Sequence, residues 1–257
     1  MKLIRVGCVA TLLGWSGPPL SALADESPDN RRTKGSNPQE MVSRLELRYE
    51  YLDLPAGEYL NQLYFRGDYA FNEKMAVGVQ LPVAFGGDET TGTQSGIGDI
   101  AMGGRNKLTF GESMAWITGV DLWFDTASHG TLGAGWNQVV PNMALTYWPN
   151  RRLLVWAMYK YTGSFGDGRD KPPISESLIQ SGGLYNFPGG YWLLLTPGVA
   201  LNHEESDQAS LFLEGEVGKV VAPGVELWMR GGDHLFGIGR DERMGWKAET
   251  GIRYLFH

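Results

Sequence analysis

Polar and apolar side chains alternate strictly through most of the chain after residue 41. In the first such stretch, Arg44, Glu46 and Arg48 are interleaved with Leu45 and Leu47. Successive side chains of a β-strand point to opposite faces, so this period of two predicts strands with one polar and one apolar face. The pattern predicts about twelve strands, at residues 42–52, 59–71, 74–85, 96–110, 113–124, 136–148, 151–164, 177–187, 190–202, 208–220, 224–235 and 243–256.

The connections between these strands alternate between short and long. Short turns are expected at 72–73, 111–112, 149–150, 188–189 and 222–223, and longer polar loops at 86–95, 125–135, 165–176, 202–208 and 237–242. This asymmetry, with an even number of strands and aromatic residues near the strand ends, is typical of outer-membrane barrels. We therefore predict an all-β fold, a transmembrane antiparallel up-and-down β-barrel over residues 41–257. A secreted β-sandwich also has alternating strands, but it does not need strands of this length.

Three prolines lie inside predicted strands. Pro82, Pro141 and Pro197 each lack the N–H that a β-ladder uses, and a closed barrel has no free edge on which to place them. We expect them to mark β-bulges.

The first 40 residues differ from the rest of the chain. Lys2 and Arg5 precede an apolar stretch at 6–15, and Ala-Leu-Ala at 22–24 is a small-x-small cleavage site, so residues 1–24 are predicted to be a signal peptide. Residues 25–40 contain no residue of a type usually buried, and we expect them to form a polar, mobile N-terminal arm outside the fold.

The amino-acid composition of the chain argues against several classes of function. Glycine accounts for 36 of 257 residues, but no collagen-like period appears, and no apolar run after residue 24 is long enough for a membrane helix. The only cysteine, Cys8, lies in the predicted signal peptide, so cysteine chemistry is not expected. The net charge is -7, which disfavours nucleic acid as a partner.

Charged residues on the polar faces must point into the barrel. At mid-bilayer, an Arg or Lys on the lipid side would cost about 2 to 4 kcal/mol. Because the first and last strands are neighbours in a closed barrel, oppositely charged residues on them are expected to form ladders. The predicted lumen-lining residues are Arg44, Glu46, Arg48, Glu50, Arg66, Asp68, Asp99, Arg105, Lys107, Asp121, Glu214, Glu216, Arg230, Lys247, Glu249 and Arg253, together with Lys160 and Glu226. Nine are basic and nine acidic, so we expect no strong ion selectivity.

The C-terminus has a polar-x-Gly-x-x-aromatic-x-aromatic arrangement. It consists of Glu249, Gly251, Tyr254 and Phe256, and it resembles the signal read by the outer-membrane barrel-assembly machinery. The resemblance implies that Gly251, Tyr254 and Phe256 act in assembly and that this machinery is a partner.

A second resemblance covers about 70 residues. It rests on GIGDIAMGGRNKL at 96–108, a strand ending at Asp125, and LGAGWNQVVPNMALTYW at 132–148. These segments resemble the outer-membrane family named for a putative meta-pathway of phenol degradation, whose members are often labelled transporters of hydrophobic or aromatic compounds. The resemblance implies a transporter-like barrel.

No stretch of the chain predicts a catalytic or cofactor site. The glycine-rich stretch at 96–104 continues as a strand and lacks the helix N-terminus that a phosphate site needs. His203 and Ser206 are three residues apart, which would put them on opposite faces of a strand. The histidines lack metal-ligand spacing, although the acidic loops offer a weak Ca²⁺ site or contact lipopolysaccharide through divalent ions.

The sequence therefore predicts a monomer of the bacterial outer membrane that is not an enzyme and needs no metal or cofactor. Its expected function is passive uptake of small hydrophobic or aromatic solutes through a narrow charged lumen. The surrounding lipid and lipopolysaccharide are the other expected partners. Two alternatives stay open: a plugged structural or loop-presenting barrel without transport, and a lipid-modifying barrel enzyme.

Overall fold

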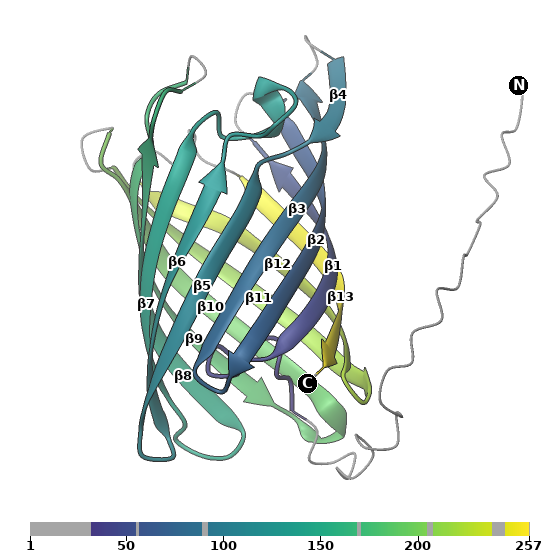
Figure 1. The fold of residues 1–257 in the computed structure, drawn as a ribbon, viewed down its shortest axis with the longest axis vertical. Helices are drawn as coiled ribbons and strands as arrows, with labels where there is room; N and C mark the ends of the chain where they lie inside the picture. The colour runs from purple at the N-terminus through teal and green to yellow at the C-terminus, as the bar shows by residue number, and fades with distance from the viewer. Residues whose placement is uncertain are drawn as a thin grey trace, which may run out of the picture.

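The computed structural model describes residues 32–54, 57–88, 92–168, 171–204, 208–237 and 245–256. These residues form a single antiparallel sheet that closes into a barrel (Figure 1). Its strands are β1 (Ser43–Asp53), β2 (Tyr59–Asn72), β3 (Met75–Asp88), β4 (Gly92–Ile97), β5 (Ile100–Phe110), β6 (Met114–Phe124), β7 (Asn137–Tyr147), β8 (Leu153–Phe165), β9 (Ser175–Asn186), β10 (Tyr191–Asn202), β11 (Gln208–Ala222), β12 (Val225–Gly237) and β13 (Trp246–Phe256). Two short 3₁₀ turns, Gly130–Leu132 and Pro188–Gly190, complete the list for this part of the chain.

The wall of the barrel has twelve strands, as predicted, because β4 and β5 both pair with β3. The barrel closes where β1 pairs with β13, with Leu45 opposite Tyr254 and Glu46 opposite Arg253. The predicted strand at 96–110 is thus interrupted at residues 98 and 99. At this point β3 carries Pro82, whose carbonyl accepts a hydrogen bond from Gly98 N.

The two faces of each strand have the predicted chemistry. Arg44 and Glu46 are 8% and 6% exposed, whereas Leu45 and Leu47 on the other face are 48% and 40% exposed. The outer surface is therefore a band of exposed apolar side chains, with aromatic residues such as Phe71 and Phe110 toward the short turns and Phe85 and Phe165 toward the loops. Among the described residues, no helix is long and apolar enough to cross a bilayer.

The prediction that the three prolines mark bulges holds at Pro82 and is wrong at Pro141 and Pro197. Between the pairs Gln80–Ala101 and Val83–Ile97, two residues of β3 lie opposite three residues at the junction of β4 and β5. The pairs Val139–Gly163 and Asn142–Lys160 flank Pro141 without a change of register. Pro197 likewise lies in a gap of unchanged register between β9 and β10. A missing N–H removes a bond but does not require an extra residue. Further register shifts occur at 70–72, 211–212 and 220–222.

Residues 32–42, called here the N-terminal segment, lie inside the barrel at the end with the short turns (Figure 1). This corrects the prediction that residues 25–40 form a mobile arm outside the fold. Polar residues need polar partners, and the lumen supplies these partners as water would. The predicted signal peptide and residues 25–31 lie outside the described residues, as does His257.

Apolar side chains fill the remainder of this end of the lumen. Leu154, Leu184, Trp192, Leu194 and Trp228 form a cluster of buried side chains. Trp192 and Trp228 are 2% and 3% exposed. The packed core of this barrel therefore lies inside the lumen near the short turns.

Candidate functional site: the charged lumen

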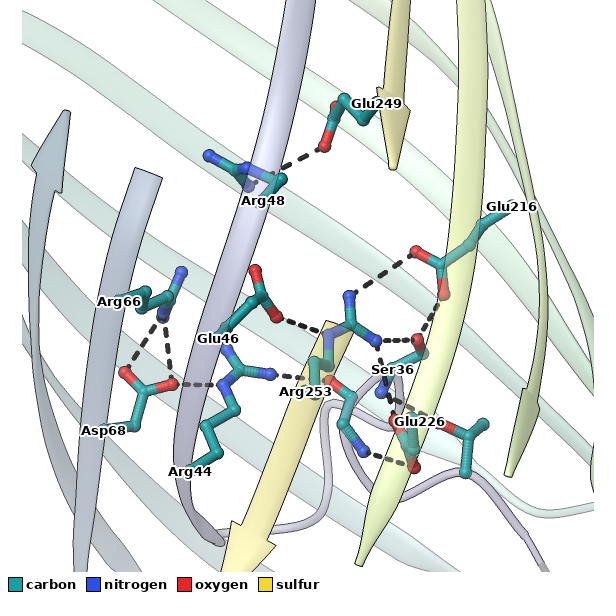
Figure 2. A network of polar contacts seen from close by, with 12 residues as sticks. Ser36, Arg44, Glu46, Arg48, Arg66, Asp68, Glu216, Glu226, Glu249 and Arg253 are labelled. Carbon is teal, nitrogen blue, oxygen red and sulfur yellow. Dashed lines mark hydrogen bonds and ion pairs between the residues drawn. The ribbon is translucent and has the colours of Figure 1, made fainter. Parts of the chain in front are cut away.

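A row of alternating charges crosses the seam of the barrel. The strand register places Glu226 opposite Arg253, Arg253 opposite Glu46, and Glu46 opposite Arg66. Arg253 Nε donates to Glu46, and its Nη1 lies 3.7 Å from Glu226 Oε2 (Figure 2). The alternation within each strand thus becomes a ladder of opposite charges between strands.

A second row lies on β11, β12 and β13. Glu216 is opposite Arg230, and Arg230 is opposite Glu249. Arg230 Nη2 lies 2.6 Å from Glu216 Oε2, and Arg48 Nη1 lies 3.7 Å from Glu249 Oε2. Glu50 faces Glu249 across the seam. The excess of carboxylates at this level is compensated by Lys247, whose Nζ is 2.6 Å from Glu214 and 3.3 Å from Glu249.

Asp68 forms ion pairs with three arginines. Arg44 donates to it, Arg66 Nε lies 3.1 Å away, and Arg105 Nη2 lies 3.6 Å away. Its carboxylate lies against the wall because Gly78 on β3 has no side chain: a Cβ there would overlap Asp68 Oδ1. Gly103 provides the same space for Asp121. These glycines widen the lumen where the charged residues project into it.

The N-terminal segment is anchored on the two charge rows. Glu226 Oε1 accepts hydrogen bonds from the backbone N–H groups of Lys34 at 2.8 Å and Gly35 at 3.3 Å. The Ser36 hydroxyl donates to Glu216 and accepts from Arg253 Nη1 at 2.6 Å (Figure 2). Buried carboxylates of the ladder therefore serve as acceptors for the segment as well as for arginines.

Gln39 fastens the segment to the opposite wall. Its Nε2 donates to Thr146 Oγ1 at 2.7 Å, and its Oε1 accepts from Trp148 Nε1 at 3.0 Å. Lys107 Nζ donates to the Gln39 carbonyl at 2.7 Å, so this predicted lumen residue holds the segment. Next along the chain, Met41 is buried in a small apolar cluster of the wall.

Asp99 holds the loop between β6 and β7 inside the other end of the lumen. Its carboxylate accepts hydrogen bonds from Ala127 N at 3.2 Å and Ala134 N at 2.6 Å. Leu132 of this loop is fully buried against Ala84 and Ala127. Burial raises the pKa of the Asp99 carboxyl, which lies between β4 and β5, and the two N–H donors oppose this shift.

Two adjacent cavities lie inside the barrel beside the N-terminal segment. Their volumes are about 290 Å³ and 270 Å³, and both are lined by Pro38, Arg66, Asp68, Arg105 and Met158. The larger one is called here the chamber. Its wall also contains Asp121, Trp123, Asn142 and Lys160.

The structure brings the predicted lumen residues into three groups. The ladder and its neighbours contain Arg44, Glu46, Arg48, Glu50, Arg66, Asp68, Glu214, Glu216, Arg230, Lys247, Glu249 and Arg253. Arg105 and Asp121 line the chamber, whereas Asp99 and Lys107 anchor the two inward-folded segments. The predicted assembly residues lie on β13, with Gly251 against Trp228, Tyr254 42% exposed and the Phe256 ring stacked on Tyr254 at 6.1 Å.

Sequence reasoning missed Ser36, Gln39 and Trp123. The first two are polar residues in a polar stretch, and their only signal is the run of hydrogen-bonding side chains before β1. A Ser–His contact was also missed: Ser177 Oγ lies 2.9 Å from His203 Nε2 and 3.0 Å from Tyr159 OH. Ser206 lies outside the described residues. Within them, no group of three His, Cys, Asp or Glu side chains is arranged to hold a metal.

No family model and no curated protein matches the sequence. Solved structures of outer-membrane barrels are similar in fold. They include an outer membrane channel from Pseudomonas putida F1 (TM-score 0.64, 14% identity, 84% of this chain and 96% of that one) and the NanC porin (TM-score 0.60, 9% identity, 82% and 98%). The KdgM porin matches with a TM-score of 0.56 and 12% identity over 83% of this chain and 99% of its own. The predicted fold class, an antiparallel barrel of twelve strands, is confirmed.

Proposed function

We propose that the protein is a bacterial outer-membrane barrel for passive uptake of small hydrophobic or aromatic solutes. The observation that carries the proposal is the chamber, a space of about 290 Å³ inside a closed barrel whose outer surface is apolar. A barrel of twelve strands lies between the eight-stranded barrels, which side chains fill, and the sixteen-stranded porins, which hold a water channel. A lumen of intermediate width would admit small molecules one at a time.

The fold similarity to an outer membrane channel and two porins supports the proposal. So does the resemblance of residues 96–108 and 132–148 to the family named for phenol degradation, which we keep as a proposed relationship. We also propose that the protein is a monomer and not an enzyme, that the barrel-assembly machinery inserts it, and that its exposed band contacts lipid and lipopolysaccharide.

Transport through the lumen requires displacement of the N-terminal segment. The segment and the apolar cluster around Trp192 occupy the end with the short turns. The segment is held by hydrogen bonds rather than by a covalent link. We therefore propose that it works as a gate.

The same hydrogen bonds favour a second candidate, a plugged barrel without transport. In that case the segment is a permanent part of the core, and the charge ladder stiffens the wall. The two candidates differ in whether solute enters through the wild-type protein.

The test is solute entry into proteoliposomes, measured by swelling, together with conductance in planar bilayers. The solute is benzamide, a small neutral aromatic compound. We expect faster entry than into protein-free liposomes, a small conductance for the wild type, and a several-fold larger conductance for a variant that lacks residues 32–40. A variant that lacks residues 25–31 is the matched control. Entry equal to that of protein-free liposomes would favour the plugged barrel.

A further inference from the structure

We propose that the chamber binds small aromatic monocarboxylates, with Lys160 and Arg105 as the groups that hold the carboxylate. This inference rests on the proposed function and narrows its solute class. The charges that face open space differ from the charges of the lumen as a whole.

The eighteen inward charges are balanced, but the chamber is not. Among the described residues, three cations and two carboxylates line it: Arg66, Arg105, Lys160, Asp68 and Asp121. Asp68 already contacts Arg44 as well as Arg66 and Arg105. The second cavity has the same bias, with six cations and four carboxylates in its lining.

The imbalance arises because other carboxylates are turned away from open space. Glu216 and Glu226 are each 1% exposed, and Glu249 is 4% exposed. They are covered by arginines and by the N-terminal segment. The side chains of Arg66 and Arg105, in contrast, remain 28% and 33% exposed.

Lys160 is the cation available to a ligand. It projects from β8 into the chamber, and no hydrogen bond or ion pair within 4 Å joins it to another described residue. The carboxylates that interact with it at longer range are Glu176, Asp121 and Glu214. An incoming carboxylate would give its ammonium group the direct partner that it lacks.

The register places a gap between Lys160 and Arg105. Arg105 is opposite Gly119, Gly119 is opposite Asn142, and Asn142 is opposite Lys160, so that the row crosses β5 to β8. Three strand spacings separate the backbones by about 14 Å, which two long cationic side chains can span with a carboxylate between them. Gly119 contributes no side chain to this gap, and the Asn142 amide lies beside it.

The rest of the chamber suits an aromatic body. Ile117, Trp123, Ala144 and Met158 line it, and Pro38 of the N-terminal segment also belongs to its wall. Ligand pockets begin at about 300 Å³, so a volume of about 290 Å³ suits a single ring and is too small for a long chain. The chamber lining has one more cation than carboxylates, and this single surplus positive charge favours a monoanion as the ligand.

The experiment compares benzoate, benzamide and benzamidinium, which have nearly the same size and differ in charge. Binding to the detergent-solubilised protein is measured by saturation-transfer NMR, and entry into proteoliposomes is measured separately, both at about pH 8 so that benzoate is ionised. We expect benzoate to bind about tenfold more tightly than benzamide, the factor for one charge-assisted hydrogen bond, and benzamidinium to bind least.

Lys160→Gln should remove most of the preference for benzoate, and Asp121→Asn should increase it. Lys219→Gln, which makes the same change of charge at a partly exposed residue of the outer face, is the matched control and should have no effect. Equal binding of the three compounds, or an unchanged preference in Lys160→Gln, would overturn the inference. If benzoate binds but does not enter, the binding site is supported and the transport function is rejected. If benzamide enters and benzoate is not preferred, transport is supported and the carboxylate site is rejected.

Discussion

The Glu226 carboxylate is the acceptor that ties the N-terminal segment to the barrel, and Glu226→Gln should loosen it. The carboxylate is 1% exposed, and its Oε1 accepts both Lys34 N at 2.8 Å and Gly35 N at 3.3 Å. The other oxygen faces Arg253 at 3.7 Å. Glutamine keeps one acceptor oxygen of the same size but loses the charge, and it presents an N–H group to the guanidinium.

The free energy that Glu226→Gln removes from the docked state follows from these contacts. A hydrogen bond to a charged group is worth about 1.5 to 3 kcal/mol, and one between neutral groups is worth about 1 kcal/mol. Two such bonds become neutral, and the attraction to Arg253 is lost. We expect the docked state to lose about 2 kcal/mol relative to the released state, which corresponds to about thirtyfold in the docking equilibrium.

The assay is cleavage by trypsin between Lys34 and Gly35 in the folded, reconstituted protein, followed by mass spectrometry. When release and docking are fast, the cleavage rate follows the population of the released state, so Glu226→Gln should be cut about thirtyfold faster. Glu73→Gln makes the same chemical change in the exposed turn between β2 and β3 and should behave as wild type. Equal cleavage rates for Glu226→Gln and wild type would refute the role of Glu226 as the anchor.

Two further outcomes are expected. Arg230→Ala leaves the buried Glu216 with Arg253 at 3.8 Å as its nearest remaining cation. Urea unfolding in detergent should show that the free energy of unfolding falls by about 3 kcal/mol. A decrease below about 1 kcal/mol would mean that Arg253 compensates. Phe256→Ala removes a large aromatic group from β13, the strand that closes the barrel on β1. This change should lower the amount of protein inserted in the membrane, measured in membrane fractions of cells. Phe187→Ala, at an exposed site outside the strands, is the control and should not lower it.

The strands could be predicted from the sequence because a barrel wall separates two solvents. Leu45 and Leu47 must face lipid, and Arg44 and Glu46 must not, so the period of two is strict, and the strand ends agree within a few residues. The ladder across the seam also follows, since closure forces β1 beside β13 and sets Glu46 against Arg253. Where the wall is irregular, as at Gly98 and Asp99, the strand pattern alone does not show the break.

What could not be predicted is what fills the lumen. A polar residue is compatible with water and with a polar lumen, so Ser36 and Gln39 have the same sequence signature as a solvated arm. For the same reason, a count of inward charges cannot separate Glu216, covered by Ser36 and arginines, from Lys160, which faces the chamber. The bias of the chamber depends on which carboxylates are covered, and this is a property of packing.

The position of the N-terminal segment also determines the order in which the barrel can be completed. The segment immediately precedes β1, yet its partners Glu216, Glu226 and Arg253 lie 180 to 217 residues later, on the last three strands. It cannot dock until these strands have been made and the seam between β1 and β13 has formed. A barrel caught before that step would have only its wall side chains in the lumen near the short turns, so the docked segment indicates that folding of this chain is complete.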